Sequence, residues 1–454
     1  MLPTNVNKCL QTHPRGCIDV QSWRRCRAAR LAGTRHSTSS ARIPSNTPTW
    51  PTFFLSADVR ICKVWDADYP WDVRTSKVCR SLTAAGHEVH LVARNKAQQP
   101  VHEVLPEAVM HRLSPWPIGR GLSAATMFPA FFNPRWLYAI HDTARRINAD
   151  LILVRDLPLA PSAIAVGKML GVPTVMDMAE NYPAMMRSLY DNQVHRPWDF
   201  LVRNPRAVSA VERWVLRHID HVVVVVEESR DRLVELGYSP ARITVVSNTP
   251  PLERLDAAPH VHATGPLKVN YLGLLEAPRG LGWVIDAIAR VAARGVDVRL
   301  TIIGSGRERE MFEQQAKMLG LSAPAVQFTG YLPNVEALRL VSEADVGLVP
   351  HQPTDSWNTT IPNKLFDYMA AGLAVITSDA RPAARIVRET QTGEVFTGRD
   401  PESLPAAIER LTDPGYRAAS AARGRRAVRT KYNWEADTVR LLTALDQTVS
   451  AAGR

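Results

Sequence analysis

Short apolar runs alternate with amphipathic segments along most of this chain, and this alternation constrains the fold more than any other feature. Runs such as Leu151–Val154 and His221–Val226 have the length and character of strands buried on both faces. Between the runs, apolar residues recur at helical spacing, and glycines such as Gly86 and Gly171 end the helices. A strand–helix–strand order predicts a parallel sheet covered by helices. The strands expected in the first half are Val59–Trp65, Val89–Ala93, Leu151–Val154, Val172–Met176, His221–Val226 and Ile243–Val246.

The alternation breaks at residues 248–266, which hold four prolines and little periodicity and are predicted to be an interdomain linker. It then starts again. The strands expected beyond the linker are Lys268–Leu272, Val298–Ile303, Val326–Phe328, Val346–Val349, Leu373–Thr377 and Glu394–Phe396. We therefore predict an α/β protein with two doubly wound parallel-sheet domains, residues 51–247 and 267–428. A C-terminal helix in residues 429–454 is expected to pack back toward the first domain. Residues 100–148 and 181–218 are less regular.

Charge is distributed unevenly along the chain. Residues 1–50 contain eight basic residues and one acidic residue, Asp19, so they carry +7 of the total charge of +11 and leave +4 on the rest. This first segment has no apolar core of the secretory type, and we expect it to be a disordered basic tail. A mildly basic remainder fits an anionic ligand or membrane surface and does not require nucleic acid. The five cysteines include no CxxC pair, which argues against a zinc site or a disulfide framework and favours the cytoplasm.

One helix–strand unit of the second domain, TTIPNKLFDYMAAGLAVITSD (359–379), carries charges where a ligand could bind. Pro362 suits the first helical position, with Asn363 and Lys364 in the first turn. A helix N-terminus with such a lysine attracts phosphate, and Asp367 could accept hydrogen bonds from a ribose. A nucleoside diphosphate would fit this unit. For this stretch alone, an amphipathic helix with solvated charges is the favoured alternative.

An arginine lies near the end of the first strand of the second domain. That strand is followed by Gly273, and Arg279 and Gly280 precede the next helix. An arginine with neighbouring backbone amides can hold a diphosphate through two hydrogen bonds. A surface arginine in a glycine turn explains the pattern equally well.

Two more glycine turns follow strands of the same domain. Gly304 and Gly306 come directly after Val298–Ile303 and open a helix, although Arg309 stands where a dinucleotide fingerprint needs glycine. In FTGYLP, backbone groups near Phe328 could read the edge of a base and Tyr331 could stack on it. Core packing is the alternative for Phe328.

In their order and spacing, these motifs resemble the second half of family 4 glycosyltransferases. The matching stretches are Arg279-Gly280, IIGSGRERE, VQFTGYLP, SEADVGLVP and IPNKLFDYMAAGLAVITSD, and, more loosely in the first half, DVRTSKVCRSLTAAGHEVHLVAR and GVPTVMDMAENYPAM. The resemblance implies the GT-B fold, in which two Rossmann-like domains face each other across a cleft. It also implies a retaining enzyme that uses a nucleotide-sugar donor.

The resemblance assigns roles to individual residues. It implies that Arg279 and Lys364 hold the donor diphosphate and stabilise it as it leaves. The residues that it implies for nucleotide-sugar binding are Gly273, Gly304, Gly306, Phe328, Tyr331, Thr359, Asn363 and Asp367. Asp367 stands where the family usually has the second glutamate of a pair, which contacts the ribose.

The sequence departs from the family pattern at several of these positions. Thr359 stands where the first glutamate of the pair is expected, eight positions before Asp367, and Leu274 stands where an arginine is frequent. The histidine common after the first-domain strand is absent from Asp177-Met178-Ala179-Glu180. These departures indicate either a distinct subfamily or weakened catalysis.

On the acceptor side, Arg74, Asp177 and Glu180 lie at or near the expected strand ends. Glu180 is the residue we expect to contact or deprotonate an acceptor hydroxyl, with a loop carboxylate without a role as an equal alternative. No acidic DxD pair lies near Arg279 and Lys364. We therefore expect neither a metal nor a cofactor, with the nucleotide sugar as co-substrate.

Aromatic and basic residues gather in residues 120–138 and 198–217. Either stretch could lie on an anionic membrane that carries a lipid-linked acceptor, and core packing explains the aromatic residues equally well. We expect a cytoplasmic protein, with peripheral contact at the inner face of the membrane as the minority alternative. His351 follows Val346–Val349 and could line the donor site, but a loop histidine without a role is the preferred interpretation.

Together, these features predict a metal-independent, retaining hexosyltransferase. It would move a sugar from a nucleotide-sugar donor to a glycan or lipid-linked acceptor in surface polysaccharide biosynthesis. A nucleotide-sugar epimerase of the same fold is one alternative, which the insertions at 100–148 and 181–218 argue against. A non-catalytic, transferase-like binding protein is the other, supported by Thr359 and the missing histidine.

Overall fold

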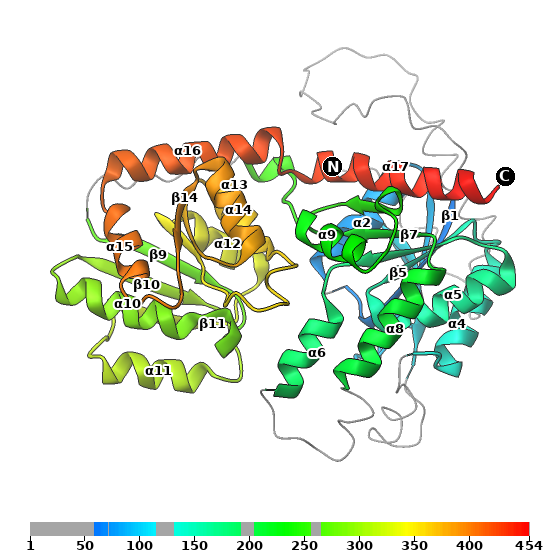
Figure 1. Ribbon diagram of the computed structural model, residues 1–454, viewed down its shortest axis with the longest axis horizontal. Coiled ribbons are helices and arrows are strands. Elements are labelled where there is room, and N and C mark those ends of the chain that lie inside the picture. Colours follow the sequence, from blue (N-terminus) through cyan, green and yellow to red (C-terminus); the bar gives the residue numbers. More distant parts are fainter. Residues whose placement is uncertain (1–58, 71, 115–130, 192–203, 256–264, 454) are drawn as a thin grey trace, which may run out of the picture. The chain divides into compact units, whose positions relative to one another are not determined.

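The described part of the chain forms two sheets, each with helices on both faces (Figure 1). The predicted fold class, a doubly wound parallel sheet repeated along the chain, is confirmed. The predicted tail, 1–50, lies outside the described residues. The computed structural model describes residues 59–70, 72–114, 131–191, 204–255 and 265–453.

The first sheet has eight strands in the order β3-β4-β2-β1-β5-β6-β7-β8. Only β3, at the edge, runs antiparallel to its neighbour among these strands. The strands are β1 (Arg60–Asp68), β2 (Glu88–Arg94), β3 (His102–Leu105), β4 (Ala108–Leu113), β5 (Leu151–Arg155), β6 (Thr174–Met178), β7 (His221–Val224) and β8 (Ile243–Val245). The helices in this part of the chain are α2 (Val73–Ala84), α4 (Pro134–Arg146), η1 (Leu157–Leu159), α5 (Ala160–Leu170), α6 (Tyr182–Asp191), α8 (Pro205–His218), α9 (Glu227–Glu235), η2 (Pro240–Arg242) and η3 (Leu252–Leu255).

Alternate residues of these strands serve two different cores. In β1, Cys62 and Val64 pack with the helices α4, α5 and α8. Ile61 points to the other face and packs with α2 and with α17 (Trp434–Ala452), the last helix of the chain. The alternation follows from the period of two along a strand, and it explains why both faces of β1 are apolar.

The second sheet has six parallel strands in the order β11-β10-β9-β12-β13-β14. They are β9 (Leu267–Leu272), β10 (Val298–Ile303), β11 (Val326–Gly330), β12 (Val346–Val349), β13 (Ala374–Ser378) and β14 (Gly393–Phe396). The helices are η4 (Ala277–Arg279), α10 (Leu281–Ala293), α11 (Arg309–Met318), α12 (Asn334–Ser342), α13 (Asn363–Ala371), α14 (Arg381–Thr390), α15 (Ser403–Arg410) and α16 (Pro414–Thr430). In Figure 1, α10 and α11 lie on one face of this sheet, and α13, α14 and α16 lie on the other.

The strand order of the second sheet reverses between β9 and β12. These two strands pair only at Val346 with Val269 and at Gly347 with Asn270. Farther along, the backbone N–H of Leu272 donates to the hydroxyl of Tyr368 in α13, at 2.8 Å. Beyond the last backbone pair, the Tyr368 side chain therefore satisfies a strand N–H that β12 does not pair. Doubly wound sheets bind ligands at such a switch point.

Several local predictions were wrong or incomplete. Residues 100–148, predicted to be irregular, contain the β3–β4 hairpin and α4. The alternation in β3 was hidden because its residues are exposed or half-buried at the sheet edge and include His102 and Glu103. The described ends of the predicted insertion, 181–218, are the helices α6 and α8. Pro362 precedes the helix as its N-cap, and α13 begins at Asn363.

The predicted linker, 248–266, contains η3 and continues through residues 256–264, which lie outside the described residues. Its start is held by α17. Asp437 accepts hydrogen bonds from the backbone N–H of Ser247 (3.0 Å) and from the hydroxyl of Thr249. Trp434 Nε1 donates to Ser81 Oγ of α2 at 2.8 Å. The last helix of the chain thus packs on the first sheet through buried polar contacts as well as apolar ones.

We expect Asp437→Ala to lower the free energy of unfolding by about 2 to 3 kcal/mol, because the fully buried carboxylate leaves the Ser247 and Thr249 donors unpaired when it is removed. Urea denaturation followed by circular dichroism measures the change. Gln447→Ala, at an exposed position of the same helix, is the control and should shift stability by less than about 0.5 kcal/mol. Equal stability of both variants would contradict the assigned role.

Candidate functional site

Arg279, His351 and Lys364 come together at the carboxyl edge of the second sheet. Arg279 ends η4, which follows β9; His351 follows β12; and Lys364 lies in the first turn of α13. Burial and the Arg279 charge lower the pKa of Lys364 well below its ordinary value. Burial, Lys364 and Arg279 lower the pKa of His351 in the same way. These mutual effects place the groups within electrostatic reach of one another.

Lys364 is only 6% exposed, yet its Nζ has no hydrogen-bond partner among the described residues. The Nζ lies 4.0 Å from the centre of the Tyr271 ring. Gly273 makes room for it, because a Cβ at this position would lie 2.8 Å from Nζ. A buried amine beside an aromatic face, without a carboxylate, is costly in free energy, and an anion would satisfy it.

Glycines at this edge allow the backbones of neighbouring loops to pack closely together. Gly280 has φ +72° and a Cβ there would overlap the carbonyl oxygen of Pro350, in the loop after β12. Gly304 has φ +141° and a Cβ there would overlap the carbonyl of Gly273. Gly306 packs against the backbone of Leu275. Close backbone packing therefore joins the loops that follow β9, β10 and β12.

Other residues predicted for nucleotide-sugar binding have different surroundings. Asp367 forms an ion pair with Arg254 Nη1 of η3 at 2.5 Å. Phe328 packs against the core of the second domain, which is the alternative considered from the sequence. The Tyr331 side chain is 78% exposed, and Asn363 is half-buried. The structure therefore gathers Arg279, Lys364 and the glycines, and commits Asp367 to another partner.

Thr359 lies in a loop that contacts the first domain. Its Oγ1 accepts a hydrogen bond from Asn181 Nδ2 (3.0 Å) and donates to the carbonyl of Asp355 (2.9 Å). Thr360 Oγ1 donates to the carbonyl of Ala179 at 2.8 Å. The position at which the resemblance implies a glutamate is thus occupied by a hydroxyl that already has its partners.

Charged side chains at the carboxyl edge of the first sheet form a buried network. Arg74 Nη2 lies 2.7 Å from Asp177 Oδ1, and Arg155 Nη1 lies 3.3 Å from Asp177 Oδ2. Burial would raise the pKa of Asp177, but Arg74 and Arg155 outweigh it and hold that pKa well below its usual range. Arg74 and Asp177, both predicted for the acceptor side, therefore neutralise each other.

Glu180 differs from its neighbours, because no described residue donates a hydrogen bond to its carboxylate. Burial raises the pKa of Glu180 to about 7, Asp156 adds to the rise, and Arg155 and Arg279 oppose it. Arg279, which opposes the rise, belongs to the second domain. A carboxyl group with a pKa near 7 suits general acid–base chemistry at neutral pH.

The sequence prediction missed several residues of these two clusters. Arg155 and Asp156 stand directly after a predicted strand, the signal used for other site residues. Asp156 has φ +60°, unusual for a residue other than glycine, and its Oδ1 accepts from the backbone N–H of Ala179 at 2.8 Å. No sequence pattern pointed to Trp357. Its ring centre lies 5.5 Å from Arg279 Cζ.

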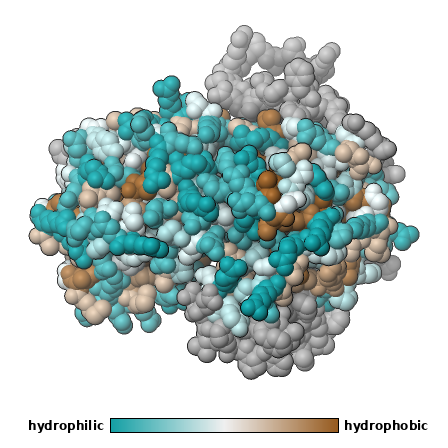
Figure 2. Space-filling view, viewed as in Figure 1, coloured by the Kyte–Doolittle hydropathy of each residue, from teal (hydrophilic) through white to brown (hydrophobic). Residues whose placement is uncertain are grey.

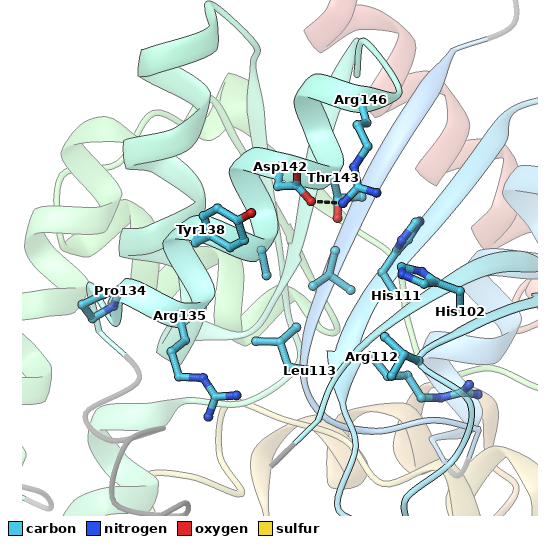
Figure 3. Close-up of a pocket in the computed structure, with 13 residues that line it drawn as sticks. His102, His111, Arg112, Leu113, Pro134, Arg135, Tyr138, Asp142, Thr143 and Arg146 are labelled. Carbon is cyan, nitrogen blue, oxygen red and sulfur yellow. Dashed lines mark hydrogen bonds and ion pairs between the residues drawn. The ribbon is translucent and has the colours of Figure 1, made fainter. Parts of the chain in front are cut away.

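A separate cavity of about 530 Å³ lies in the first domain, between the β3–β4 hairpin and α4 (Figure 3). His102 and His111 form one wall, and Tyr138 and Asp142 of α4 form the other. Asp142 is paired with Arg146, as the dashed line in Figure 3 shows. The cavity holds both apolar and paired charged groups, and this arrangement does not favour one class of ligand.

The aromatic–basic stretches are only partly described. Trp136 is fully buried in the first-domain core and Trp214 packs against that core, so core packing explains both. Phe132 and Tyr138 are exposed. Residues 115–130 and 192–203 lie outside the described residues. The face of the molecule drawn in Figure 2 is mainly hydrophilic.

No helix in the part of the chain that the structure describes is both long enough and apolar enough to cross a membrane. The same part of the chain contains no group of three or more His, Cys, Asp or Glu side chains that could hold a metal ion.

Comparison with known families identifies both halves of the chain. Residues 72–249 match the family described as glycosyl transferase 4-like domain. Residues 266–413 match the family described as glycosyl transferases group 1. The chain is a family 4 glycosyltransferase. This assignment favours the predicted transferase over the epimerase and the non-catalytic protein.

Individual relatives agree with this assignment. Glycogen synthase from Mycobacterium tuberculosis is 28% identical over 317 residues, which are 69% of this chain and 71% of that protein. Phosphatidyl-myo-inositol mannosyltransferase from Mycolicibacterium smegmatis is 30% identical over 187 residues, 41% of this chain and 46% of that protein.

Solved structures show the same fold at low sequence identity. Sucrose-phosphate synthase from Thermosynechococcus elongatus has a TM-score of 0.68 at 20% identity and covers 87% of this chain and 100% of its own. HepE from Anabaena, in complex with UDP and glucose, has a TM-score of 0.66 at 15% identity and covers 86% of this chain and 100% of its own. The glycosyltransferase therefore has the GT-B fold.

We expect Lys364→Met to raise the free energy of unfolding by about 1 to 4 kcal/mol, because an apolar side chain of similar length removes the buried, unpartnered amine. The folded pKa of Lys364 lies below the unfolded value of 10.5, so the unfolded chain binds the proton more readily. The advantage of the variant should therefore be smallest above about pH 10.5 and grow as pH falls. Urea denaturation at several pH values measures it.

Lys317→Met, at an exposed position of α11, is the matched control and should change stability by less than about 0.5 kcal/mol at every pH. A Lys364→Met protein that is less stable than the wild type would show that the amine has a stabilising partner.

Proposed function

We propose that this glycosyltransferase moves a hexose from a nucleotide-sugar donor to a hydroxyl of a glycan or lipid-linked acceptor, with retention of configuration and without a metal ion. The observation that carries the proposal is the pair Arg279 and Lys364, whose buried Nε and Nζ atoms lack hydrogen-bond partners among the described residues. They lie at the switch point of the second sheet, where a doubly wound domain binds its ligand.

On the donor side, negative charge grows on the diphosphate as the bond to the sugar breaks. Arg279, Lys364 and the N-terminus of α13 all stabilise negative charge at this edge of the sheet. The lysine side chain can turn its Nζ off the Tyr271 ring toward a phosphate, because each of its carbon–carbon bonds rotates. An anion beside it favours the protonated amine, so donor binding and proton uptake by Lys364 are coupled.

On the acceptor side, Glu180 contacts or deprotonates the attacking hydroxyl. A polar cavity of about 430 Å³ has the next residue along the chain, Asn181, in its wall and is also lined by Arg187, Asp355 and Thr359, among others. Side chains of this kind suit the hydroxyl groups of a saccharide. Arg74 and Asp177 fix the loop that carries Glu180 through their buried ion pair.

Known relatives support the substrate classes. HepE is described in complex with UDP and glucose, and the relatives include a glycogen synthase and a mannosyltransferase that acts on a phosphatidylinositol. We infer a nucleoside-diphosphate hexose as donor and a glycan or lipid-linked saccharide as acceptor. Surface polysaccharide biosynthesis is the process that this combination favours.

The donor assignment is tested by a thermal-shift screen with UDP, GDP, ADP and their glucose and mannose derivatives. We expect one base to stabilise the protein. With that nucleotide sugar as substrate, Arg279→Gln should lower kcat/KM for transfer by about 10²- to 10³-fold. The reason is that the variant loses a positively charged group that stabilises the leaving diphosphate. EDTA should leave the wild-type rate unchanged.

Arg299→Gln is the matched control, because Arg299 is exposed near the start of β10, at the opposite end of the strand from the site. Absence of stabilisation by every nucleotide would overturn the proposed function, and strong inhibition by EDTA would overturn the metal-free mechanism.

Glu180 should impose a pH dependence on transfer. Its pKa of about 7 means that the carboxylate is protonated below this pH and can no longer accept a proton, so kcat/KM should fall as pH drops through 7. Glu180→Gln should lower kcat/KM by about 10²- to 10⁴-fold and abolish this limb of the profile.

The exposed Glu310 provides the control variant, Glu310→Gln, which should keep the wild-type profile. A Glu180→Gln profile that still falls below pH 7 would assign the titration to another group.

A further inference from the structure

His351 occupies a constrained place at the edge of the second sheet. It follows β12, and its backbone carbonyl accepts a hydrogen bond from the hydroxyl of Ser378, the last residue of β13. The side chain is 1% exposed. Its ring centre lies 3.9 Å from the ring of Trp357, which covers it.

Both ring nitrogens of His351 are buried and lack a hydrogen-bond partner among the described residues. A buried imidazole normally places one donor and one acceptor, since each unmade hydrogen bond costs free energy. Both ring nitrogens of His351 are open, and the charge of Lys364, whose Nζ is also unpartnered, acts on this ring. These open positions indicate a ligand site.

The surrounding charges decide which ligand groups this ring can bind. Burial, together with Lys364 and Arg279, lowers the pKa of His351 well below its usual value, so the ring is neutral. A neutral imidazole has one N–H donor and one nitrogen acceptor. Phosphate oxygens of a diphosphate ester can accept a hydrogen bond from the imidazole N–H. They carry no hydrogen that they could donate to the other ring nitrogen. The acceptor nitrogen needs a hydroxyl, which the sugar of the donor supplies.

We propose that His351 is a specificity-determining residue of the donor site, whose unpartnered ring nitrogen accepts a hydrogen bond from a hydroxyl of the transferred hexose. The proposal rests on the proposed function, and it assigns the sugar to His351 and the diphosphate to Arg279 and Lys364. Thr359 cannot serve in the same way, because its hydroxyl is committed to Asn181 and Asp355.

Trp357 packs against the ring that carries this nitrogen. Its side chain is half-buried and lies between His351 and Arg279, held by ring contacts with both. The apolar face of a hexose can replace the imidazole as the partner of the indole when the indole turns. Sugar binding therefore exchanges one ring contact for another and opens the His351 nitrogen to the hydroxyl.

The test compares affinity for a nucleoside diphosphate with affinity for the matching nucleotide sugar, by isothermal titration calorimetry. The probes are UDP, GDP and ADP with their glucose and mannose derivatives. In His351→Phe, we expect nucleoside-diphosphate affinity to stay within about 3-fold of wild type, while nucleotide-sugar affinity falls by about 10- to 100-fold. The KM for the nucleotide sugar should rise in parallel.

His351→Gln, which retains a hydrogen-bond acceptor, should recover part of the loss and provides a second reading if the phenylalanine variant does not fold. His221→Phe is the matched control, because His221 is also buried but bonds to Thr244 in the first domain. Equal loss of affinity for both ligand types in either His351 variant, or no loss for the nucleotide sugar, would overturn the proposal. If wild-type protein binds no nucleoside diphosphate, the proposed function itself fails.

Discussion

A lysine amine that is buried against an aromatic ring, without a carboxylate, determines much of the carboxyl edge of the second sheet. Lys364 needs the Tyr271 ring below it and the missing Cβ of Gly273 beside it. Burial lowers the pKa of His351, and the charges of Lys364 and Arg279 lower it further. The cost of leaving this amine unpaired is a free energy that an anionic ligand recovers, so the same arrangement that weakens the fold prepares the site.

The charged clusters at the carboxyl edges of the two sheets differ in how their side chains are paired. In the first domain, Arg74 and Asp177 neutralise each other and fix a loop. In the second, the cations keep open hydrogen-bonding positions. Glu180 differs from both clusters. Burial raises the pKa of its carboxyl group to about 7, and the charge of Arg279 opposes this rise. Glu180 thus follows the paired Asp177 closely in the chain, and Arg279, whose charge opposes the rise in the Glu180 pKa, is itself paired with Glu276 at 3.6 Å between Nε and Oε2.

Much of the fold was readable from the sequence because strands buried on both faces are short apolar runs, and Val298–Ile303 and Val346–Val349 were predicted at their observed bounds. The β3–β4 hairpin was not, because edge strands carry polar residues. Site residues were found where they follow strands, since carboxyl ends converge on one edge of a sheet. The ion pair between Asp367 and Arg254 could not be predicted from the sequence. The two residues are 113 positions apart, and only the packing of η3 brings them together.

Because the hydrogen-bond ladder between β9 and β12 ends early, different residues form the sheet and hold the seam between these two strands. The apolar runs build the sheet, whereas beyond Gly347 the shape of the seam is held by side chains such as Tyr368. Substitutions among these side chains alter the seam without removing a rung of the ladder. The packing at this seam can therefore differ between related sequences while the pairing of the strands stays the same.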